Sequence, residues 1–571
     1  MAVSAPPAPP SAATRLRVPW TRTRVVMTGV VVVFTAALVW SWRTIEFGFG
    51  ALLGGAGDVA NLLGRMLPPR FVDLPYIIEL AFLTLAMAVV GTALAIVLSV
   101  PVAVLAARNT TINRATYYAA RGVIVLARAV PDVILAVIFV RGLGIGVLPG
   151  ILAIGLHSIG MIGKLFADAI EQVDEGAREA VAAPGGGRLQ DLATAVFPQV
   201  LPSFIGTSLY RLDINLRTST ILGVVGAGGI GFELQDALRS LSYDRGLGIV
   251  IVIFVLILLV ELVSSAMRAS LIGNESTVLG AATRRRTLGD LLLARRRPRA
   301  RGRDDVTAFD RTAVRPPWTR QRIVRTAYLV GTLVVLGWSV WAADANPVDI
   351  AGAVPDMWQT FTQFVPPDFT TARSDIIEGM LETIAIGVVA TAIGALLAVP
   401  FGFLAARNVA PARWVMYAAR TFLVFERGIP ELILAVIFVA AVGLGPVGGT
   451  MALALGSLGL MAKLMADNLE EVDPGPREAV VAAGATRGQE TAASLVPQAM
   501  PSFVGSFLYL LDVNIRSATI LGIVGGGGIG FLLFNALRTL NFATASAIVI
   551  TIFAVVYAIE QLSGWVRAQL R

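Results

Sequence analysis

Long apolar runs separated by short polar stretches form the dominant pattern of this chain. Six runs in its first half approach or exceed the ~20 residues that a helix needs to cross the hydrocarbon of a bilayer. These runs are Val25 to Trp42, Ile77 to Ala107, Thr116 to Val140, Pro149 to Phe166, Phe204 to Val225 and Leu247 to Met267. The pattern predicts an all-α integral membrane protein with six spans in this half.

The second half of the chain repeats the first. The segment Pro131 to Val140 returns as Pro430 to Val439, and the offset of 299 residues holds without a gap from Ala106 to the C-terminal helix. A direct repeat of this length indicates two copies of one folding unit. We therefore expect about 12 transmembrane helices, arranged as two six-helix repeats.

The position of the positive charges predicts the orientation of these spans. The segment from Arg268 to Arg325 holds 15 arginines and five acids, and it contributes much of the net charge of +8. Arginines that flank spans mark the cytoplasmic side, and they need no nucleic-acid partner. Because six spans return the chain to its starting side, both repeats are predicted to be parallel, with both termini in the cytoplasm. We assign residues 1–272 to the first repeat, 273–316 to an Arg-rich cytoplasmic linker along the membrane lipid, and 317–571 to the second repeat.

Composition excludes several kinds of site. The chain is 56% hydrophobic, which is more than in soluble globular proteins, and it contains no cysteine, so disulfides and thiolate metal sites are excluded. The single histidine, His157, has Gly456 as its counterpart. We expect it to pack or to line a pore, and we expect no catalytic residue and no metal site.

A polar loop joins the fourth and fifth spans of each repeat: Glu171 to Gln199 (the first loop) and Glu470 to Gln498 (the second loop). Each has an Arg-Glu-Ala-Val sequence, a glycine six residues after the glutamate and a proline nineteen residues after it. These residues are Glu179, Ala180, Gly185 and Pro198 in the first loop and Glu478, Ala479, Gly484 and Pro497 in the second. A helix, a glycine turn and a second helix would form a rigid projection that docks on another protein. A solvated connection without a partner is the alternative.

This spacing resembles the E-A-A…G…P loop of ABC-importer permeases, and the resemblance covers almost the whole chain. The strings Gly163 to Ala167, Leu212 to Arg217 and Gly226 to Glu233 resemble the phosphonate-type permeases, the PhnE family, which normally use two separate copies. The resemblance implies a type I importer permease of the bacterial inner membrane, with a MetI-like core and both copies fused, so that no second permease chain is needed.

The resemblance also implies the partners. Two copies of a cytoplasmic ABC ATPase subunit would bind ATP and Mg²⁺ and would contact the glutamate, alanine and glycine of each loop. An extracytoplasmic binding protein would deliver phosphonate or phosphate. The sequence contains no G-x-x-x-x-G-K-[ST] motif, so we expect the chain to bind no cofactor and to be a transport subunit, not an enzyme. Because the first loop has Pro184 to Gly187 where the second has Ala483 to Thr486, we expect the first to be less helical after its glycine.

Charged residues recur inside two spans of each repeat. A polar stripe on the fifth span comprises Tyr210, Asp213, Arg217 and Thr220, and it returns as Tyr509, Asp512, Arg516 and Thr519. Asn215 and Asn514 fall on the opposite helix face. The third span places Arg121, Arg128 and Asp132 on one face, repeated by Arg420, Arg427 and Glu431. A charge at the bilayer centre costs about 2.5–3.5 kcal/mol, so these residues are expected to face protein or water. They either give a passing oxyanion fork-shaped donors or lock neighbouring helices together.

A glycine-rich string follows the fifth span. It contains Gly226, Gly228, Gly229 and Gly231 in the first repeat and Gly525, Gly527, Gly528 and Gly530 in the second. The string matches G-x-G-x-x-G, but no predicted strand precedes it, so a dinucleotide site is not expected. Close backbone packing or an outer gate fits the glycines better.

The function predicted from these features is import of phosphonate, phosphate or phosphite through an ATP-driven permease. Two other classes stay open at this point: an ion- or proton-coupled secondary transporter of anions, and a structural or signalling membrane protein without transport. Within the importer class, another small solute such as methionine is the alternative substrate.

Overall fold

The computed structural model describes residues 22–46, 57, 61–62, 64–271, 320–344 and 346–570. The regular elements formed by these residues are all helices, which confirms the predicted fold class. The predicted linker at 273–316 lies outside the described residues. The chain forms two compact units: unit 1 comprises Met1–Leu62 and Pro367–Arg571, and unit 2 comprises Leu63–Pro366.

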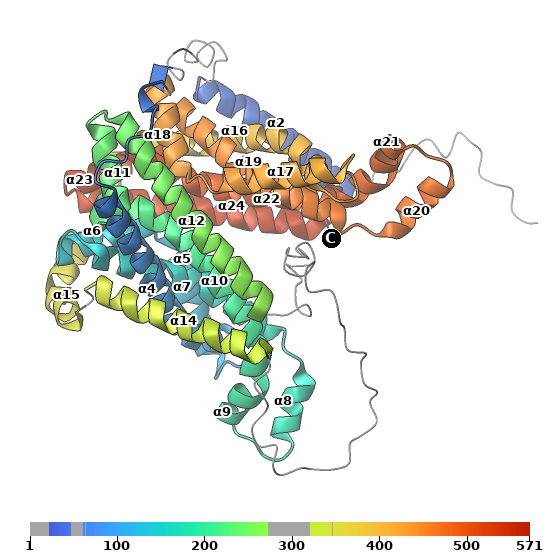
Figure 1. Ribbon diagram of the computed structural model, residues 1–571, viewed down its shortest axis with the longest axis horizontal. Coiled ribbons are helices and arrows are strands. Elements are labelled where there is room, and N and C mark those ends of the chain that lie inside the picture. The colour runs from blue at the N-terminus through green and yellow to red at the C-terminus, as the bar shows by residue number, and fades with distance from the viewer. Residues whose placement is uncertain are drawn as a thin grey trace, which may run out of the picture. The chain divides into compact units, whose positions relative to one another are not determined.

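The two units share one succession of helices (Figure 1), and unit 2 also contains the helix Pro347–Thr362, which has no counterpart among the described residues of unit 1. Unit 2 contains α4 (Leu74–Ala106), α5 (Arg114–Ala129), α6 (Asp132–Leu143), α7 (Val147–Glu171), α8 (Glu175–Ala182), α9 (Arg188–Asp191), η1 (Leu192–Val196), α10 (Phe197–Leu222), η2 (Gly223–Ala227), α11 (Ile230–Arg239), α12 (Tyr243–Leu271), α14 (Arg320–Ala342) and α15 (Pro347–Thr362). Unit 1 contains α2 (Arg22–Thr44), α16 (Arg373–Ala405), α17 (Arg413–Arg427), α18 (Glu431–Val442), α19 (Pro446–Glu470), α20 (Pro474–Ala482), α21 (Arg487–Glu490), η3 (Thr491–Leu495), α22 (Val496–Leu521), η4 (Gly522–Val524), α23 (Ile529–Arg538) and α24 (Phe542–Leu570).

Each unit is built around one long helix pair, α4 with α7 in unit 2 and α16 with α19 in unit 1, and α10 or α22 packs beside it. Small residues allow the close approach: a Cβ atom added at Gly91 of α4 would lie 2.9 Å from the Ile154 side chain of α7. Phe166 and Phe204 stack with ring centroids 3.7 Å apart, near the end of unit 2 that carries the first loop. The core of each unit is therefore a tight three-helix contact.

The first helix of each sequence repeat packs in the unit that contains the core of the other repeat. Helix α2 packs on α16 in unit 1, and its Phe34 ring meets the Phe507 ring of α22 edge to face at 4.8 Å. Helix α14 packs on α4 in unit 2, where Phe82 meets Trp338 at 5.7 Å. The compact units therefore differ from the sequence repeats by an exchange of α2 for α14 and α15.

Within the described residues, nine helices are long and apolar enough to cross a membrane, or ten if the bent pair α5 and α6 forms one span. The predicted third span, Thr116 to Val140, is not one straight helix. Helices α5 and α6 meet at 84° around Pro131. Proline has no N–H and disfavours helical backbone at the residue before it, and Val130 is accordingly extended.

Candidate functional site

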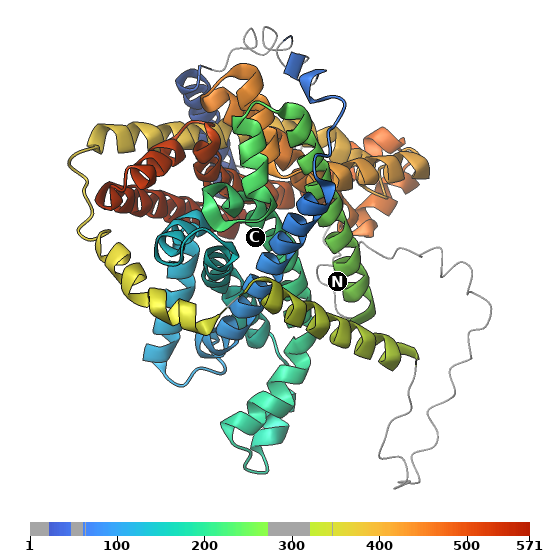
Figure 2. The same ribbon diagram turned by 60° about the vertical axis from the view of Figure 1, so that its left-hand side comes forward.

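The first and second loops project from their units as helix, glycine turn and second helix (Figures 1 and 2). Helix α8 begins where the Asp174 carboxylate accepts from the N–H of Gly176 at 2.9 Å, and Asp473 caps α20 in the same way. Gly185 and Gly484 then turn the chain with φ of +87° and +84°, a backbone conformation that favours glycine.

The expected loss of helix after the first glycine does not occur. Helices α9 and α21 are both four residues long. The Gln190 side chain accepts from the N–H of Gly187 at 2.8 Å, and Gln489 accepts from Thr486 at 2.9 Å. Because the glutamine supplies the cap, a glycine in place of threonine does not shorten the helix.

The residues predicted to contact an ATPase are all solvent-exposed. They are Glu179, Ala180 and Gly185 in the first loop and Glu478, Ala479 and Gly484 in the second. Sequence reasoning missed two exposed apolar side chains beside them, Leu189 at 82% and Val481 at 49% exposure. An apolar residue in a polar loop was the available signal.

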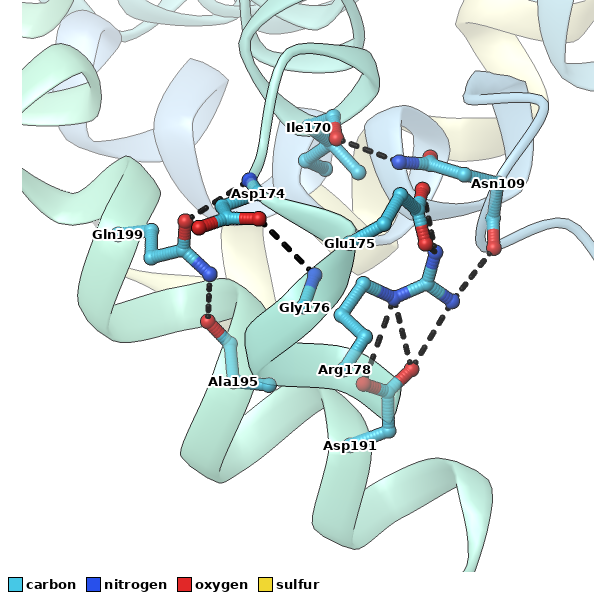
Figure 3. A network of polar contacts seen from close by, with 9 residues as sticks. All are labelled: Asn109, Ile170, Asp174, Glu175, Gly176, Arg178, Asp191, Ala195 and Gln199. Carbon is cyan, nitrogen blue, oxygen red and sulfur yellow. Dashed lines mark hydrogen bonds and ion pairs between the residues drawn. The ribbon is translucent and has the colours of Figure 1, made fainter. Parts of the chain in front are cut away.

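One arginine ties the first loop together (Figure 3). The Arg178 guanidinium bonds the Asp191 carboxylate at 3.0 Å and the Glu175 carboxylate at 2.9 Å. Its Nη2 also donates to the main-chain carbonyl of Asn109, in the turn between α4 and α5, at 2.8 Å. The hydrogen bond with Asp191 is the main cause that raises the pKa of Arg178 above its ordinary value.

A glutamate at the end of α7 fastens the same turn. Glu171 accepts from the N–H of Arg108 at 2.9 Å and from the Arg121 guanidinium at 3.0 Å. Glu470 repeats both contacts with Arg407 and Arg420. Arg121 and Arg420 therefore belong to the loop end of their units.

Arg128 and Asp132 do not share the continuous helix face that the sequence predicts, because Arg128 lies in α5 and Asp132 begins α6 beyond the 84° bend. In unit 1, Arg427 ends α17 and Glu431 begins α18, so the same separation recurs. The break also explains the lone histidine: His157 Nδ1 donates to the carbonyl of Val130, beside the break, at 3.0 Å.

The structure brings together the charges of the fifth spans. Arg217 pairs with Asp213 on α10 at 3.2 Å, and Arg516 pairs with Asp512 on α22. The hydroxyls of Thr220 and Thr519 instead donate to the carbonyls of Arg217 and Arg516 in their own helices. Tyr210 and Tyr509 are each 43% exposed. The predicted stripe is thus reduced to an ion pair and an exposed tyrosine.

A buried amide network on the opposite face of α10 was missed. Asn215 accepts from Ser158 of α7 at 3.1 Å and donates to Thr92 of α4 at 2.8 Å. Asn514 makes the same bonds with Ser457 and Thr391, at 3.0 and 2.9 Å. The asparagine, serine and threonine occur at equivalent positions in both repeats, and this repetition could have indicated the network from the sequence.

The network has one extra member in unit 2. The buried Arg211 donates from Nε to Ser158 at 3.0 Å, whereas its counterpart in unit 1 is Leu510. A second difference lies nearby: a Cβ atom at Gly456, the counterpart of His157, would lie 2.9 Å from Glu431. The glycine therefore makes room for a side chain longer than Asp132.

The glycine strings form tight turns between α10 and α11 and between α22 and α23. Gly226, Gly228 and Gly229 have φ between +71° and +100°. A Cβ atom at Gly231 would lie 1.9 Å from the carbonyl oxygen of Thr220. The N–H of Ile230 donates to Thr84 of α4 at 2.9 Å, and unit 1 repeats the bond between Ile529 and Thr383. Close packing is what this geometry requires.

The family described as "Binding-protein-dependent transport system inner membrane component" matches residues 99–272 and 398–570, which together exceed half of the chain. One matched segment falls in each sequence repeat.

Curated relatives extend this likeness. The chain is 50% identical over 536 residues to the Phosphate-import permease protein PhnE of Mycolicibacterium smegmatis, with 94% of this chain and 93% of the relative covered. It is 44% identical over 239 residues to the Phosphite transport system permease protein PtxC of Stutzerimonas stutzeri, which covers 42% of this chain and 87% of that relative. It is 36% identical over 117 residues to the Putative cryptic phosphonate transport system permease protein PhnE2 of Escherichia coli, which covers 20% of this chain and 96% of that relative.

The duplicated helical fold and these matches show that the chain belongs to the inner membrane components of binding-protein-dependent transport systems, as a PhnE-type permease in which two copies are fused.

Proposed function

We propose that this chain is the complete transmembrane part of an ATP-driven importer for phosphate or a related phosphorus oxyanion, phosphonate or phosphite. The observation that carries the proposal is the 50% identity, over 94% of the chain, to the phosphate-import permease of Mycolicibacterium smegmatis. Because both repeats are present on one chain, no second permease chain is needed.

Two copies of a cytoplasmic ATPase subunit bind the permease, one at each loop. The exposure of Glu179 with Ala180 and of Glu478 with Ala479 supports this role, since exposed side chains are free to meet a partner. ATP and Mg²⁺ are held by the ATPase, and the permease itself performs no chemistry. Both loops and both termini lie in the cytoplasm, and an extracytoplasmic binding protein docks on the other side.

The substrate pathway uses the ion pairs of the fifth spans. Arg217 and Arg516 offer fork-shaped donors that match a phosphate oxyanion, while Asp213 and Asp512 keep the binding weak enough for release. Arg128, Asp132, Arg427 and Glu431 contribute near the breaks of the third spans. The glycine turns after α10 and α22 act as close-packed pivots of an outer gate. Closure of the ATPase pair shifts the permease between its two access states.

Reconstitution tests this function. The chain, its ATPase and its binding protein are placed in liposomes with ATP on the ATPase side, and uptake of radiolabelled phosphate is measured in the presence of phosphite or an alkylphosphonate. ATP-dependent uptake that a phosphorus oxyanion inhibits supports the proposal. Uptake that stops when the proton gradient is collapsed at constant ATP would instead favour a coupled secondary transporter, a class that family membership already disfavours.

Calorimetric titration of the binding protein with the same three anions identifies the substrate. Methionine serves as the control ligand. Tight binding of methionine with no binding of any phosphorus oxyanion would contradict the proposed substrate class while leaving the importer class intact.

A further inference from the structure

The first loop is fastened to its unit at two points. Arg178 of α8 donates to the carbonyl of Asn109 in the turn between α4 and α5, at 2.8 Å. The N–H of Asp174 donates to the side chain of Gln199, in α10, at 3.0 Å. Figure 3 shows both points together. The loop therefore contacts a turn between two spans as well as the span that follows it.

Arg178 is also held on both sides by acids. Its guanidinium forms ion pairs with Asp191 of α9 at 3.0 Å and with Glu175 of α8 at 2.9 Å. The Arg178 side chain is only 17% exposed. A planar guanidinium with several filled donors has little freedom to move independently of its partners. Helix α8, helix α9 and the turn at Asn109 are thus joined through one side chain.

The turn itself is anchored to the spans. The Asn109 side chain donates to the carbonyl of Ile170 at the end of α7, at 2.7 Å. The Thr110 hydroxyl donates to Val104 of α4, also at 2.7 Å. A displacement of α8 is therefore passed to the ends of α4 and α7.

The second loop lacks most of this attachment, and the sequence explains why. Pro474 occupies the position of Glu175, so Arg477 loses that carboxylate. In the described part of the chain, Arg477 makes its side-chain hydrogen bond to Glu490 alone, and its side chain is 38% exposed. Asn408 still donates to Leu469 at 2.5 Å, so the turn is present although Arg477 does not reach it.

We infer that Arg178 is a positioning residue that transmits the movement of the first loop to the ends of α4 and α7, and that the first loop drives its unit more firmly than the second. This inference rests on the proposed function, in which an ATPase subunit moves each loop.

The matched pair Arg178→Ala and Arg477→Ala tests the inference. Each full-length variant is reconstituted with the ATPase and the binding protein, and the number of phosphate ions transported per ATP hydrolysed is measured. We expect Arg178→Ala to lower this ratio about tenfold, within the range of typical coupling free energies, while the ATPase still co-purifies. We expect Arg477→Ala to lower it by less than about threefold. Equal losses, or an unchanged ratio for Arg178→Ala, would overturn the inference.

Arg178→Lys separates positioning from charge. A lysine keeps the positive charge but cannot hold Asp191 and the Asn109 carbonyl with a rigid fork, so we expect only partial recovery of the ratio. Full recovery would show that charge alone matters.

Amide hydrogen exchange on the same complexes gives a readout that does not depend on transport. The N–H groups of Thr110 and Thr111 bond to the carbonyl of Ala107 within the turn. Their exchange should accelerate in Arg178→Ala, whereas the equivalent Val409 and Ala410 should be unaffected in Arg477→Ala. Unchanged exchange at Thr110 and Thr111 would refute the inference. Absence of ATP-dependent uptake by the wild-type complex would instead refute the proposed function.

Pro474→Glu supplies the missing partner in the second loop. The new carboxylate stands three residues before Arg477, as Glu175 stands before Arg178, and it lies in the first turn of α20, where negative charge is favourable. We expect slower amide exchange over residues 474–482 in this variant. Exchange that stays the same would show that the glutamate position does not govern how firmly a loop is held.

Discussion

At the level of single residues, each unit holds a partly buried ion pair inside a span. Asp213 is buried, while the side chain of Arg217 keeps 26% exposure. Among the described residues, Asp213 Oδ1 and Arg217 Nε have no hydrogen-bond partner, although both atoms are inaccessible to solvent. A pair that served only to join helices would satisfy these atoms with a neighbouring helix. The proposed substrate role would use this unsatisfied hydrogen-bonding capacity.

Neutral replacements separate the two roles of this pair. Removing one partner alone would leave a buried charge uncompensated, so the test replaces both members in both repeats: Asp213→Asn with Arg217→Gln, and Asp512→Asn with Arg516→Gln. We expect phosphate uptake to be abolished while the chain still folds and binds its ATPase, as measured by transport and co-purification. Normal transport by this quadruple variant would show that the pairs have no role in the pathway.

The buried asparagines make a different prediction, which concerns stability. Asn215→Ala removes two hydrogen bonds and leaves Ser158 and Thr92 with fewer partners. We expect a destabilisation on the order of 1 kcal/mol, measured as a lower thermal unfolding midpoint in detergent. Asn514→Ala should behave alike in unit 1, and Thr332→Val on the exposed face of α14 serves as the control. If the control variant lowers the unfolding midpoint as much as the asparagine variants do, the network makes no specific contribution to stability.

These two cases show what the sequence can predict at this scale. The Asp213 and Arg217 pair is local, because four residues along a helix bring two side chains together. The partners of Asn215 lie 57 and 123 residues away, and no spacing rule connects them. The anchor of Arg178 at Asn109 is likewise 69 residues distant.

At the level of elements, apolar length predicts most spans but not the breaks inside them. The run from Thr116 to Val140 is long enough for one span, yet Pro131 divides it at 84°. Pro131 indicates this break in the sequence, because a proline removes a helix hydrogen bond and disfavours helical backbone at the preceding residue, Val130. Hydrophobicity alone cannot predict the hydrogen bond that His157 donates to the carbonyl of Val130.

The junction between α10 and α11 leads to a prediction about glycine. A methyl group at Gly231 would lie 1.9 Å from the carbonyl oxygen of Thr220, and at Gly530 it would lie 1.9 Å from that of Thr519. Gly231→Ala and Gly530→Ala should therefore force the helices apart and lower the thermal unfolding midpoint. Gly122→Ala and Gly505→Ala are matched controls, because a methyl group there meets no atom within 4 Å. In those helices alanine should be neutral or stabilise by about 0.5–1 kcal/mol. Equal unfolding midpoints for the two sets would show that the junction tolerates a side chain.

At the level of the whole molecule, fusion of the two repeats allows each one to supply its first helix to the other. Both repeats present similar core surfaces, so apolar periodicity predicts a helix at Val25 to Trp42 but cannot say which copy it packs on. The structure places it on α16 of the second repeat, and it places α14 on α4 of the first. Each compact unit consequently contains segments from both ends of the chain, and separating the repeats would remove a helix from each core.

The absence of cysteine allows a direct test of this exchange. Phe34→Cys with Phe507→Cys introduces two thiols at a ring contact of 4.8 Å, in a chain that has no other thiol. A protease site inserted in the linker between residues 273 and 316 allows the two repeats to be cut apart after treatment with a short thiol crosslinker. We expect the cleaved repeats to remain joined on a denaturing gel, and we expect the same of Phe82→Cys with Trp338→Cys, whose rings lie 5.7 Å apart in unit 2. The matched control pairs Phe34→Cys with Ser208→Cys, the counterpart of Phe507 in the first repeat. Both residues of this control pair lie before the protease site, so its cleaved repeats should separate on the gel. Separation of the repeats in the Phe34→Cys, Phe507→Cys variant as well would contradict the packing of α2 on the second repeat.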